Sequence, residues 1–234
     1  MAKLSIIILK TREKDFNRCI ASVKRSLSIS DIDYEILIIS YSPILSESNN
    51  IKNILTSNLN ISYRRNLGIS ESSGDFICFI DDDVIVPEPF FSNFSRLSRF
   101  NGPDIFSGPD ISYPVNSLQS SIQKLFVENI YLNGFKHKMR FSHPHTRIML
   151  PSQGSFTNIF IKKELFLKLG MLKNNYPVCE DTLFLYKAEK NGSYMLFSND
   201  LYVFHKRKTS LLEFLKQMFY FGKYNLILYF EEMK

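Results

Sequence analysis

Three consecutive carboxylates, Asp81, Asp82 and Asp83, directly follow an apolar run at residues 76–80. Like charges this close repel one another, and a hard divalent cation with oxygen ligands relieves that repulsion. Mg²⁺ and Mn²⁺ both accept carboxylate ligands and can bridge to substrate phosphates. A solvated acidic turn is the alternative, because Pro87 and Pro89 indicate that a loop follows. The position directly after a buried strand favours the metal site.

A second acidic pair, Glu180-Asp181, stands just before a segment with helical spacing of apolar residues. Asp181 at this position could simply cap the helix. A carboxylate held at a helix start beside a ligand crevice could also deprotonate an attacking hydroxyl. The two roles are compatible, so the sequence leaves both open.

The elements around these residues alternate between strand and helix patterns. Continuous apolar runs at 4–9, 34–40 and 76–80 predict strands buried on both faces. Apolar residues at helical spacing predict a helix over 15–27, and weaker patterns predict a short helix over 51–59, a short strand over 61–63 and a helix over 66–73 that ends at Gly74. Further helices are expected over 117–131, 162–169, 182–190 and from residue 209 onward.

This order of elements predicts a mostly parallel sheet flanked by helices, an α/β fold. In such sheets ligands bind beyond the carboxyl ends of the strands. Residues 10–13, 40–43 and 81–83 follow the three strongest strands, so their loops should share one crevice.

Composition narrows the class of protein. The chain has 234 residues and a formal net charge of +6, with 44% hydrophobic and 22% charged residues, as in a globular domain. No apolar run approaches the roughly 20 residues of a membrane span, and the first residues do not resemble a secretion signal. Cys19, Cys78 and Cys179 are odd in number and widely spaced, which favours reduced thiols in a cytoplasmic protein.

Residues 63–91 resemble the nucleotide-sugar-binding core of the family 2 inverting glycosyltransferases, which have a GT-A fold. The matching pattern is Arg-Asn-x-Gly, then Gly-Asp, an apolar strand and a DxD pair. In this sequence it consists of Arg65, Asn66, Gly68, Gly74, Asp75, Asp81 and Asp83. Residues 154–172 and 180–192 are similar to the acceptor side of that family, and residues 203–205 to its late histidine.

The resemblance implies transfer of a sugar, with inversion, from a nucleoside-diphosphate sugar, most simply UDP-linked, to a hydroxyl group. It implies Mn²⁺ or Mg²⁺ held by Asp81, Asp83 and His205, with Asp181 as the general base. The residues implied to contact the donor are Thr11, Glu13, Tyr41, Arg65, Asn66, Asp81 and Asp82. The implied acceptor is a growing surface polysaccharide or a lipid-linked glycan.

Two positions depart from the family pattern on the donor side. The segment after the first strand is Lys10-Thr11-Arg12-Glu13, where the family has a sequence like Pro-Thr-Tyr-Asn. The second strand ends in Ser40-Tyr41, where the family carries an Asp that reads the base. Stacking of Tyr41 on the base is the alternative.

We expect a transferase domain over 1–208, with a nucleotide-sugar-binding half (1–100) and an acceptor-binding half (101–208), followed by an amphipathic helical tail (209–234). The tail is apolar, and Lys206-Arg207-Lys208 stand just ahead of it. This combination favours peripheral contact with the inner face of an anionic membrane, with a homodimer contact as the alternative.

Three other functions fit parts of the sequence. A catalytically decayed nucleotide- or glycan-binding module of the same fold would explain the missing base-reading Asp. A Mg²⁺-dependent phosphoryl-transfer enzyme would also carry acids at strand ends, but it gives Asn66, Gly68 and the Glu180-Asp181 pair no role. A nucleic-acid binder is disfavoured because the basic residues are scattered.

Overall fold

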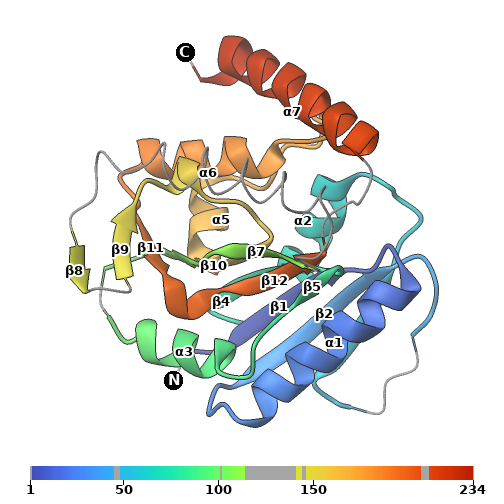
Figure 1. Ribbon diagram of the computed structural model, residues 1–234, viewed down its shortest axis with the longest axis vertical. Helices are drawn as coiled ribbons and strands as arrows, with labels where there is room; N and C mark the ends of the chain where they lie inside the picture. Colours follow the sequence, from blue (N-terminus) through green and yellow to red (C-terminus); the bar gives the residue numbers. More distant parts are fainter. Residues whose placement is uncertain are drawn as a thin grey trace.

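The strands of the first 81 residues form the parallel half of a nine-stranded sheet (Figure 1). In this half β1 (Leu4–Leu9) lies between β2 (Tyr34–Ser40) and β4 (Phe76–Asp81), and β3 (Ile51–Leu55) forms the edge beside β2. The computed structural model describes residues 2–44, 48–100, 102–113, 141–143, 146–206 and 211–233. The helix expected over 117–131 lies outside them.

The second half of the sheet is mixed. β10 (Asn158–Lys162) pairs antiparallel with β4 and with β6 (Ile105–Ser107). β11 (Met195–Ser198) pairs parallel with β6, and β9 (Thr146–Met149) and β8 (Phe141–His143) complete the far edge antiparallel to their neighbours. The strand order is therefore β3-β2-β1-β4-β10-β6-β11-β9-β8.

A small second sheet lies beside the end of β4. It contains β5 (Val84–Ile85), which follows the three carboxylates directly, β12 (Val203–Lys206) and β7 (Asp110–Tyr113). β12 pairs antiparallel with β5 so that His205 stands opposite Val84. This register brings a segment from the end of the domain against the residue after Asp83.

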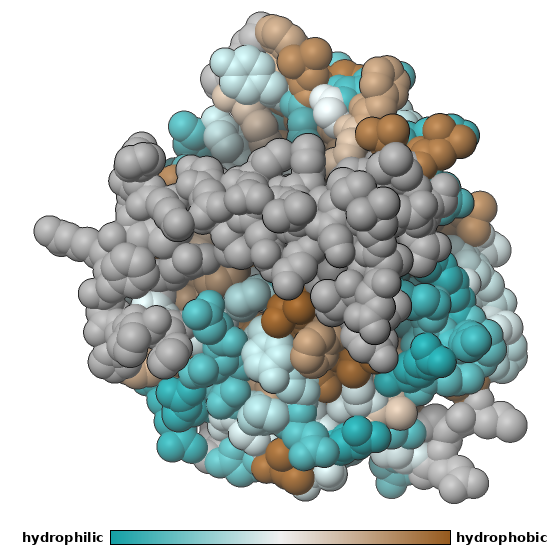
Figure 2. Space-filling view, viewed as in Figure 1, coloured by the Kyte–Doolittle hydropathy of each residue, from teal (hydrophilic) through white to brown (hydrophobic). Residues whose placement is uncertain are grey.

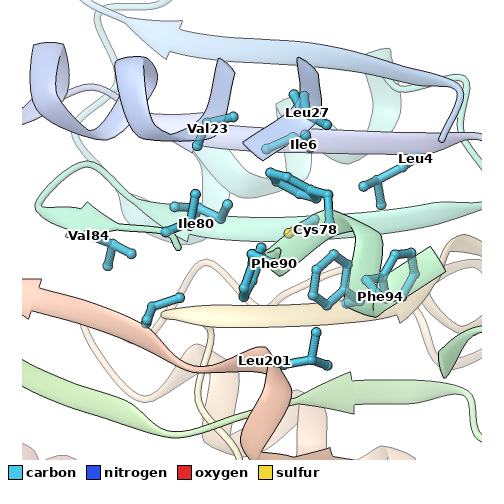
Figure 3. Close-up of a cluster of buried hydrophobic side chains, with 14 of the residues drawn as sticks. Leu4, Ile6, Val23, Leu27, Cys78, Ile80, Val84, Phe90, Phe94 and Leu201 are labelled. Atoms are coloured by element: carbon cyan, nitrogen blue, oxygen red, sulfur yellow. The ribbon is translucent and has the colours of Figure 1, made fainter. Parts of the chain in front are cut away.

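Both faces of the main sheet are covered, and the side chains of each central strand alternate between two cores. Ile6 and Ile8 belong to one core while Ile7 and Leu9 belong to the other. The first core, shown in part in Figure 3, is closed by α1 (Glu13–Ser28) and by α3 (Phe90–Leu97), whose Phe94 ring stacks on Phe160 at a centroid distance of 3.8 Å. Burial on both faces explains why these strands are apolar throughout.

The second core is closed by α2 (Ile61–Glu71), α5 (Lys163–Leu169) and α6 (Glu180–Lys190). α2 approaches the sheet closely at Gly68, where an added Cβ would lie 2.7 Å from the Ile7 side chain. The glycine of the Arg-Asn-x-Gly pattern thus allows the helix that carries Arg65 to pack directly on β1. Two short 3₁₀ turns, η3 (Pro151–Gln153) and η4 (Asn199–Leu201), complete the connections.

Two expectations from the sequence are wrong. The segment expected to be a short helix over 51–59 forms β3, because its backbone pairs with the edge of β2 and Asn53 donates to Ile38 O and Ser40 Oγ. The short strand expected over 61–63 is the first turn of α2. Asn60 caps this helix by accepting a hydrogen bond from the Tyr63 N–H at 2.9 Å.

The tail forms a single helix, α7 (Leu211–Glu232), which lies across the outside of α6 (Figure 1). Leu228 is fully buried against Tyr176, Cys179 and Leu183. The Tyr176 hydroxyl donates to Glu231 at 2.8 Å, and Lys173 pairs with Glu232 at 2.5 Å. Within the described residues, no helix has both the length and the apolar character that crossing a membrane requires.

Candidate active site

Asp81, Asp83 and His205 form a cluster of possible metal ligands at the end of β4. One ligand atom from each residue lies within 4.8 Å of the others. Asp81 is the last residue of β4, Asp83 lies in the turn to β5, and His205 comes from β12, which the small sheet pairs with β5. The Lys206 N–H donates to Asp83 O at 3.0 Å and fixes this register. The pairing of β12 with β5 thus brings His205 to Asp81 and Asp83, although 122 residues separate Asp83 from His205 in the sequence.

The imidazole of His205 is held between two carboxylates. Its Nε2 lies 3.0 Å from Asp83 Oδ1, and its Nδ1 lies 3.0 Å from Asp110 Oδ2. A carboxylate on the far nitrogen is the usual way in which a metal-binding histidine is oriented. Burial alone would raise the pKa of Asp83, but the hydrogen bond and charge of His205 and the charge of Arg12 lower it below its ordinary value. Asp83 is therefore held as an anion.

Arg65 links this cluster to the Glu180-Asp181 pair. Its Nη1 forms an ion pair with Glu180 Oε1, and its Nη2 lies 3.4 Å from Asp81 Oδ1. The guanidinium carbon also lies 5.5 Å and 5.1 Å from the ring centroids of Phe79 and Phe156. Arg65 is 5% exposed and Glu180 is 4% exposed, so this contact is shielded from solvent.

Burial shifts the titration of the acids around Arg65. It raises the pKa of Glu180 to about 7, although the Arg65 charge opposes the shift. It also raises the pKa of Asp81, where the charges of Arg65 and His205 counter only part of the effect. The single cation of Arg65 is therefore shared between two carboxylates that both lie in a poorly solvated environment.

Asp181 begins α6 with its carboxylate oriented by backbone donors. Its Oδ1 accepts from the Thr182 N–H at 2.8 Å, and its Oδ2 accepts a longer bond from the Phe156 N–H at 3.4 Å. Cys179, two residues earlier, has a φ of 67°, in the left-handed region that non-glycine residues rarely adopt. The strained turn directs Glu180 inward to Arg65 while Asp181 remains partly exposed.

Asp82 fixes the loop after β1 and is not part of the Asp81, Asp83 and His205 cluster. Its Oδ2 accepts hydrogen bonds from the Thr11 N–H at 2.5 Å, the Thr11 hydroxyl at 2.7 Å and the Arg12 N–H at 2.9 Å. Arg12 in turn reaches Asp83 at 3.5 Å. The carboxyl ends of β1 and β4 are thus brought together as the parallel sheet predicts. Glu13 opens α1 and pairs with Lys10 at 2.6 Å at the surface.

The two remaining predicted donor residues have different surroundings. Tyr41, directly after β2, accepts a hydrogen bond from Arg64 Nη1 at 2.9 Å and is 46% exposed. Asn66 points away from the carboxylates, because its side-chain amide exchanges hydrogen bonds with the Leu172 backbone at 2.8 and 3.0 Å. Asn66 therefore anchors α2 to the segment that precedes the Glu180-Asp181 turn.

Two residues of the site were not singled out from the sequence. Arg64 is 2% exposed and supports Tyr41, and Asp110 orients His205. For Glu180, the sequence did not indicate the pairing with Arg65. A sequence signal for Arg64 exists, because it and Arg65 are adjacent in a helix that packs on the sheet. A buried arginine almost always has a polar partner, so this pair of arginines indicates polar contacts at the end of the sheet. Asp110 has no such signal, because the sequence around it shows no clear helix or strand pattern, although the structure places it at the start of β7.

The fold matches solved structures of S. aureus TarS. The crystal structure of TarS 1–349 aligns with a TM-score of 0.64 at 14% identity, covering 87% of this chain and 60% of that chain. Its complex with UDP-GlcNAc aligns with a TM-score of 0.60 at 15% identity, covering 89% of this chain and 59% of that one. The longer TarS structure gives a TM-score of 0.60 at 14% identity, with 88% and 37% covered.

This chain thus spans between 37% and 60% of the length of these TarS chains. At this level of identity the similarity establishes the fold. No curated protein matches the sequence.

The family match is more specific. The profile described as Glycosyl transferase family 2 matches residues 5–191, which is most of the chain. The matched range contains all but the first residue of β1, the three carboxylates, Arg65 and the Glu180-Asp181 turn. The GT-A-like sheet confirms the fold that the sequence resemblance implied. The chain therefore belongs to glycosyltransferase family 2.

Proposed function

We propose that this glycosyltransferase moves a sugar from a nucleoside-diphosphate sugar, most simply a UDP-sugar, to an acceptor hydroxyl with inversion at the anomeric carbon. The observation that carries the proposal is the contact of Arg65 with both Asp81 and Glu180. Through this contact Asp81, a candidate ligand of a cation that binds the diphosphate, is linked to the turn that carries Asp181, the candidate base. The UDP-GlcNAc complex of TarS, a neighbour in fold, supports the choice of donor class.

Asp81, Asp83 and His205 fit a divalent cation. Two carboxylates and one imidazole suit Mn²⁺ or Mg²⁺, and the carboxylate of Asp110 orients the imidazole. Such an ion supplies the positive charge that a departing nucleoside diphosphate requires. Arg12 lies 3.5 Å from Asp83 and is about half exposed, so it can add a second positive charge at the same place.

Asp181 is the proposed general base. It is partly exposed, and two backbone N–H groups hold its carboxylate, so it can accept a proton without leaving its place. Glu180 is turned away to Arg65 and cannot serve the same acceptor. Attack by the acceptor oxygen forms its bond to the anomeric carbon as the bond to the diphosphate breaks, and Asp181 takes the hydroxyl proton.

We further propose that α7 places the enzyme on an anionic membrane that carries the acceptor as a lipid-linked glycan. The helix has two apolar faces, and the inner one packs beside the Glu180-Asp181 turn. The outer apolar face consists of residues between 55% and 78% exposed: Leu212, Leu215, Phe219, Leu226 and Phe230. The apolar surface over α7 is visible at the top of Figure 2.

The charges around this outer apolar face favour an anionic surface. Lys216 and Lys223 are exposed and follow its edge at helical spacing. Glu231 and Glu232 are turned toward Tyr176 and Lys173. The inner face of α7 packs on Cys179 and Leu183, so a membrane docked on the outer face would be separated from the Glu180-Asp181 turn by the helix alone. This arrangement supports a membrane-borne acceptor at the cytoplasmic face.

The experiment that tests the reaction is a donor panel. UDP-, GDP-, CDP- and dTDP-sugars are offered with Mn²⁺ or Mg²⁺, together with free oligosaccharides and lipid-linked glycans, and release of the diphosphate is followed. Transfer from at least one donor, with an inverted anomeric configuration in the product by NMR, supports the proposal. Nucleotide binding without transfer to any acceptor favours a catalytically decayed binding module of the same fold.

A further inference from the structure

Arg64 is a buried cation that ties together the carboxyl ends of two parallel strands. It lies in the first turn of α2, one residue before Arg65, and is 2% exposed. Its Nη2 donates to the carbonyl oxygens of Lys10, just after β1, and Ile39, in β2, at 2.9 and 2.6 Å. Burial lowers the pKa of Arg64, and the electrostatic interactions with Tyr41 and then Asp82 partly oppose this. The guanidinium is fixed at the edge of the sheet where parallel strands bind ligands.

The second arm of Arg64 holds Tyr41. Nη1 donates to the Tyr41 hydroxyl at 2.9 Å, and the guanidinium carbon lies 4.5 Å from the centroid of the ring. The ring is therefore positioned both by a hydrogen bond at its tip and by a cation against one face. Tyr41 is nevertheless 46% exposed. A rigid aromatic surface thus faces solvent beside the loop that contains Thr11.

The same corner offers no free carboxylate among residues 40–44, which are Ser, Tyr, Ser, Pro and Ile. The nearby Asp82 accepts three hydrogen bonds from Thr11 and Arg12 and is 6% exposed. An acidic side chain for reading the edge of a base is therefore missing from the end of β2. An aromatic face stands in its place, and every nucleobase has a face that can stack on it.

We propose that Tyr41, positioned by Arg64, is the platform on which the nucleobase of the donor stacks, so that this enzyme holds the base by its face and discriminates weakly among bases. The proposal rests on the proposed function, because it assigns a place to the base of the nucleoside-diphosphate donor. Arg64 acts through Tyr41 and is a positioning residue. The diphosphate is bound separately, at Asp81 and Asp83.

Calorimetric titrations of the full chain with UDP, CDP, GDP and inorganic pyrophosphate, each with saturating Mn²⁺, test this platform. Tyr41→Ala should lower the affinity for each nucleoside diphosphate by about 5- to 150-fold, the usual loss for one stacked base. The affinity for pyrophosphate should be unchanged. Tyr41→Phe keeps the ring and should stay close to wild type. Tyr63→Ala is the matched control, since Tyr63 is another partly exposed tyrosine, in α2.

Three results would overturn the platform. The first is an unchanged UDP affinity in Tyr41→Ala. The second is a preference of more than about 100-fold for one base that survives Tyr41→Ala, because stacking alone cannot supply it. The third is a wild-type chain that binds nucleoside diphosphates no better than pyrophosphate. A wild-type chain that binds neither would instead contradict the proposed function.

Discussion

The Arg65 guanidinium pairs with the buried carboxylate of Glu180 although 115 residues separate them in the sequence. The same side chain reaches Asp81, so one cation connects the end of β4 to the start of α6. Because Asp181 is the next residue after Glu180, this contact fixes the candidate base relative to the candidate metal ligands. The two halves expected from the sequence, residues 1–100 and 101–208, thus meet at Arg65.

Asp83→Ala should abolish the part of UDP binding that depends on Mn²⁺. Asp83 is held as an anion by His205 and Arg12, and its loss removes one of three clustered ligand atoms. Titration calorimetry of Mn²⁺ and UDP measures both affinities. Asp31→Ala, at an exposed acid paired with Arg99, is the control and should bind as the wild type does. Unchanged Mn²⁺ affinity in Asp83→Ala would remove the metal assignment.

Asp181→Asn should retain donor binding and lose transfer. The amide keeps the shape and its oxygen can still accept the shorter bond, from the Thr182 N–H, but it cannot take a proton from the acceptor hydroxyl. We expect a rate lower by about 10²- to 10⁴-fold, the usual contribution of a general base, with UDP affinity unchanged. The measurement is single-turnover transfer on saturated enzyme. A variant with wild-type rate would assign the base elsewhere.

Glu180→Gln should change how stability depends on pH. Because burial raises the pKa of Glu180 to about 7 from an ordinary 4.5, the folded chain binds this proton more tightly than the unfolded chain. The contribution of Glu180 is therefore fully present below pH 4.5 and is lost as the pH rises through 7. The Gln variant lacks this titration, so its free energy of unfolding should rise relative to wild type between pH 5 and 8.

The expected relative gain is at most about 3 kcal/mol, from the size of the pKa shift. Urea unfolding of both proteins at pH 5, 6, 7 and 8 gives the difference at each pH. Glu164→Gln, at an exposed position in α5, controls for the loss of a carboxylate. A difference between Glu180→Gln and wild type that stays constant over this range would contradict the raised pKa.

Leu215→Ser and Phe219→Ser together should weaken binding to anionic vesicles by at least about tenfold. The two side chains are 55% and 78% exposed on the outer face of α7, and their insertion would bury apolar surface. Vesicle flotation measures the bound fraction. Leu167→Ser, at a 72% exposed leucine in α5, is the control. Equal flotation of all proteins, or a change from dimer to monomer by ultracentrifugation, would contradict the membrane assignment.

The sequence predicts the central strands well because both faces of each are covered. β1 and β2 have the predicted bounds, and β4 extends only one residue further, to Asp81. At the edge of the sheet this signal fails. β3 is only partly buried and contains Lys52 and Asn53, so its strand conformation depends on pairing with β2. The start of α2 depends on the Asn60 cap. The short apolar pattern over 61–63 favoured a strand instead, so the cap was not recognised from the sequence.

Within the candidate site, residues adjacent to regular elements were predictable and their partners were not. Asp81, Asp83 and His205 were expected together, and the pairing of β12 with β5 brings them into one cluster. The sequence could not show that Asp82 turns to Thr11 or that Asn66 turns to Leu172, because adjacent side chains diverge according to contacts far away in the chain. Burial of Arg64 and Glu180 depends on the same long-range packing.

The central claim is that the Asp81, Asp83 and His205 cluster binds a nucleoside diphosphate through a divalent cation. Calorimetric titration of UDP into the wild-type chain, with Mn²⁺ and again with chelator, tests it most directly. We predict that UDP binds with Mn²⁺, that the chelator removes this binding, and that His205→Ala weakens it. UDP affinity that is the same with and without the cation would contradict the account.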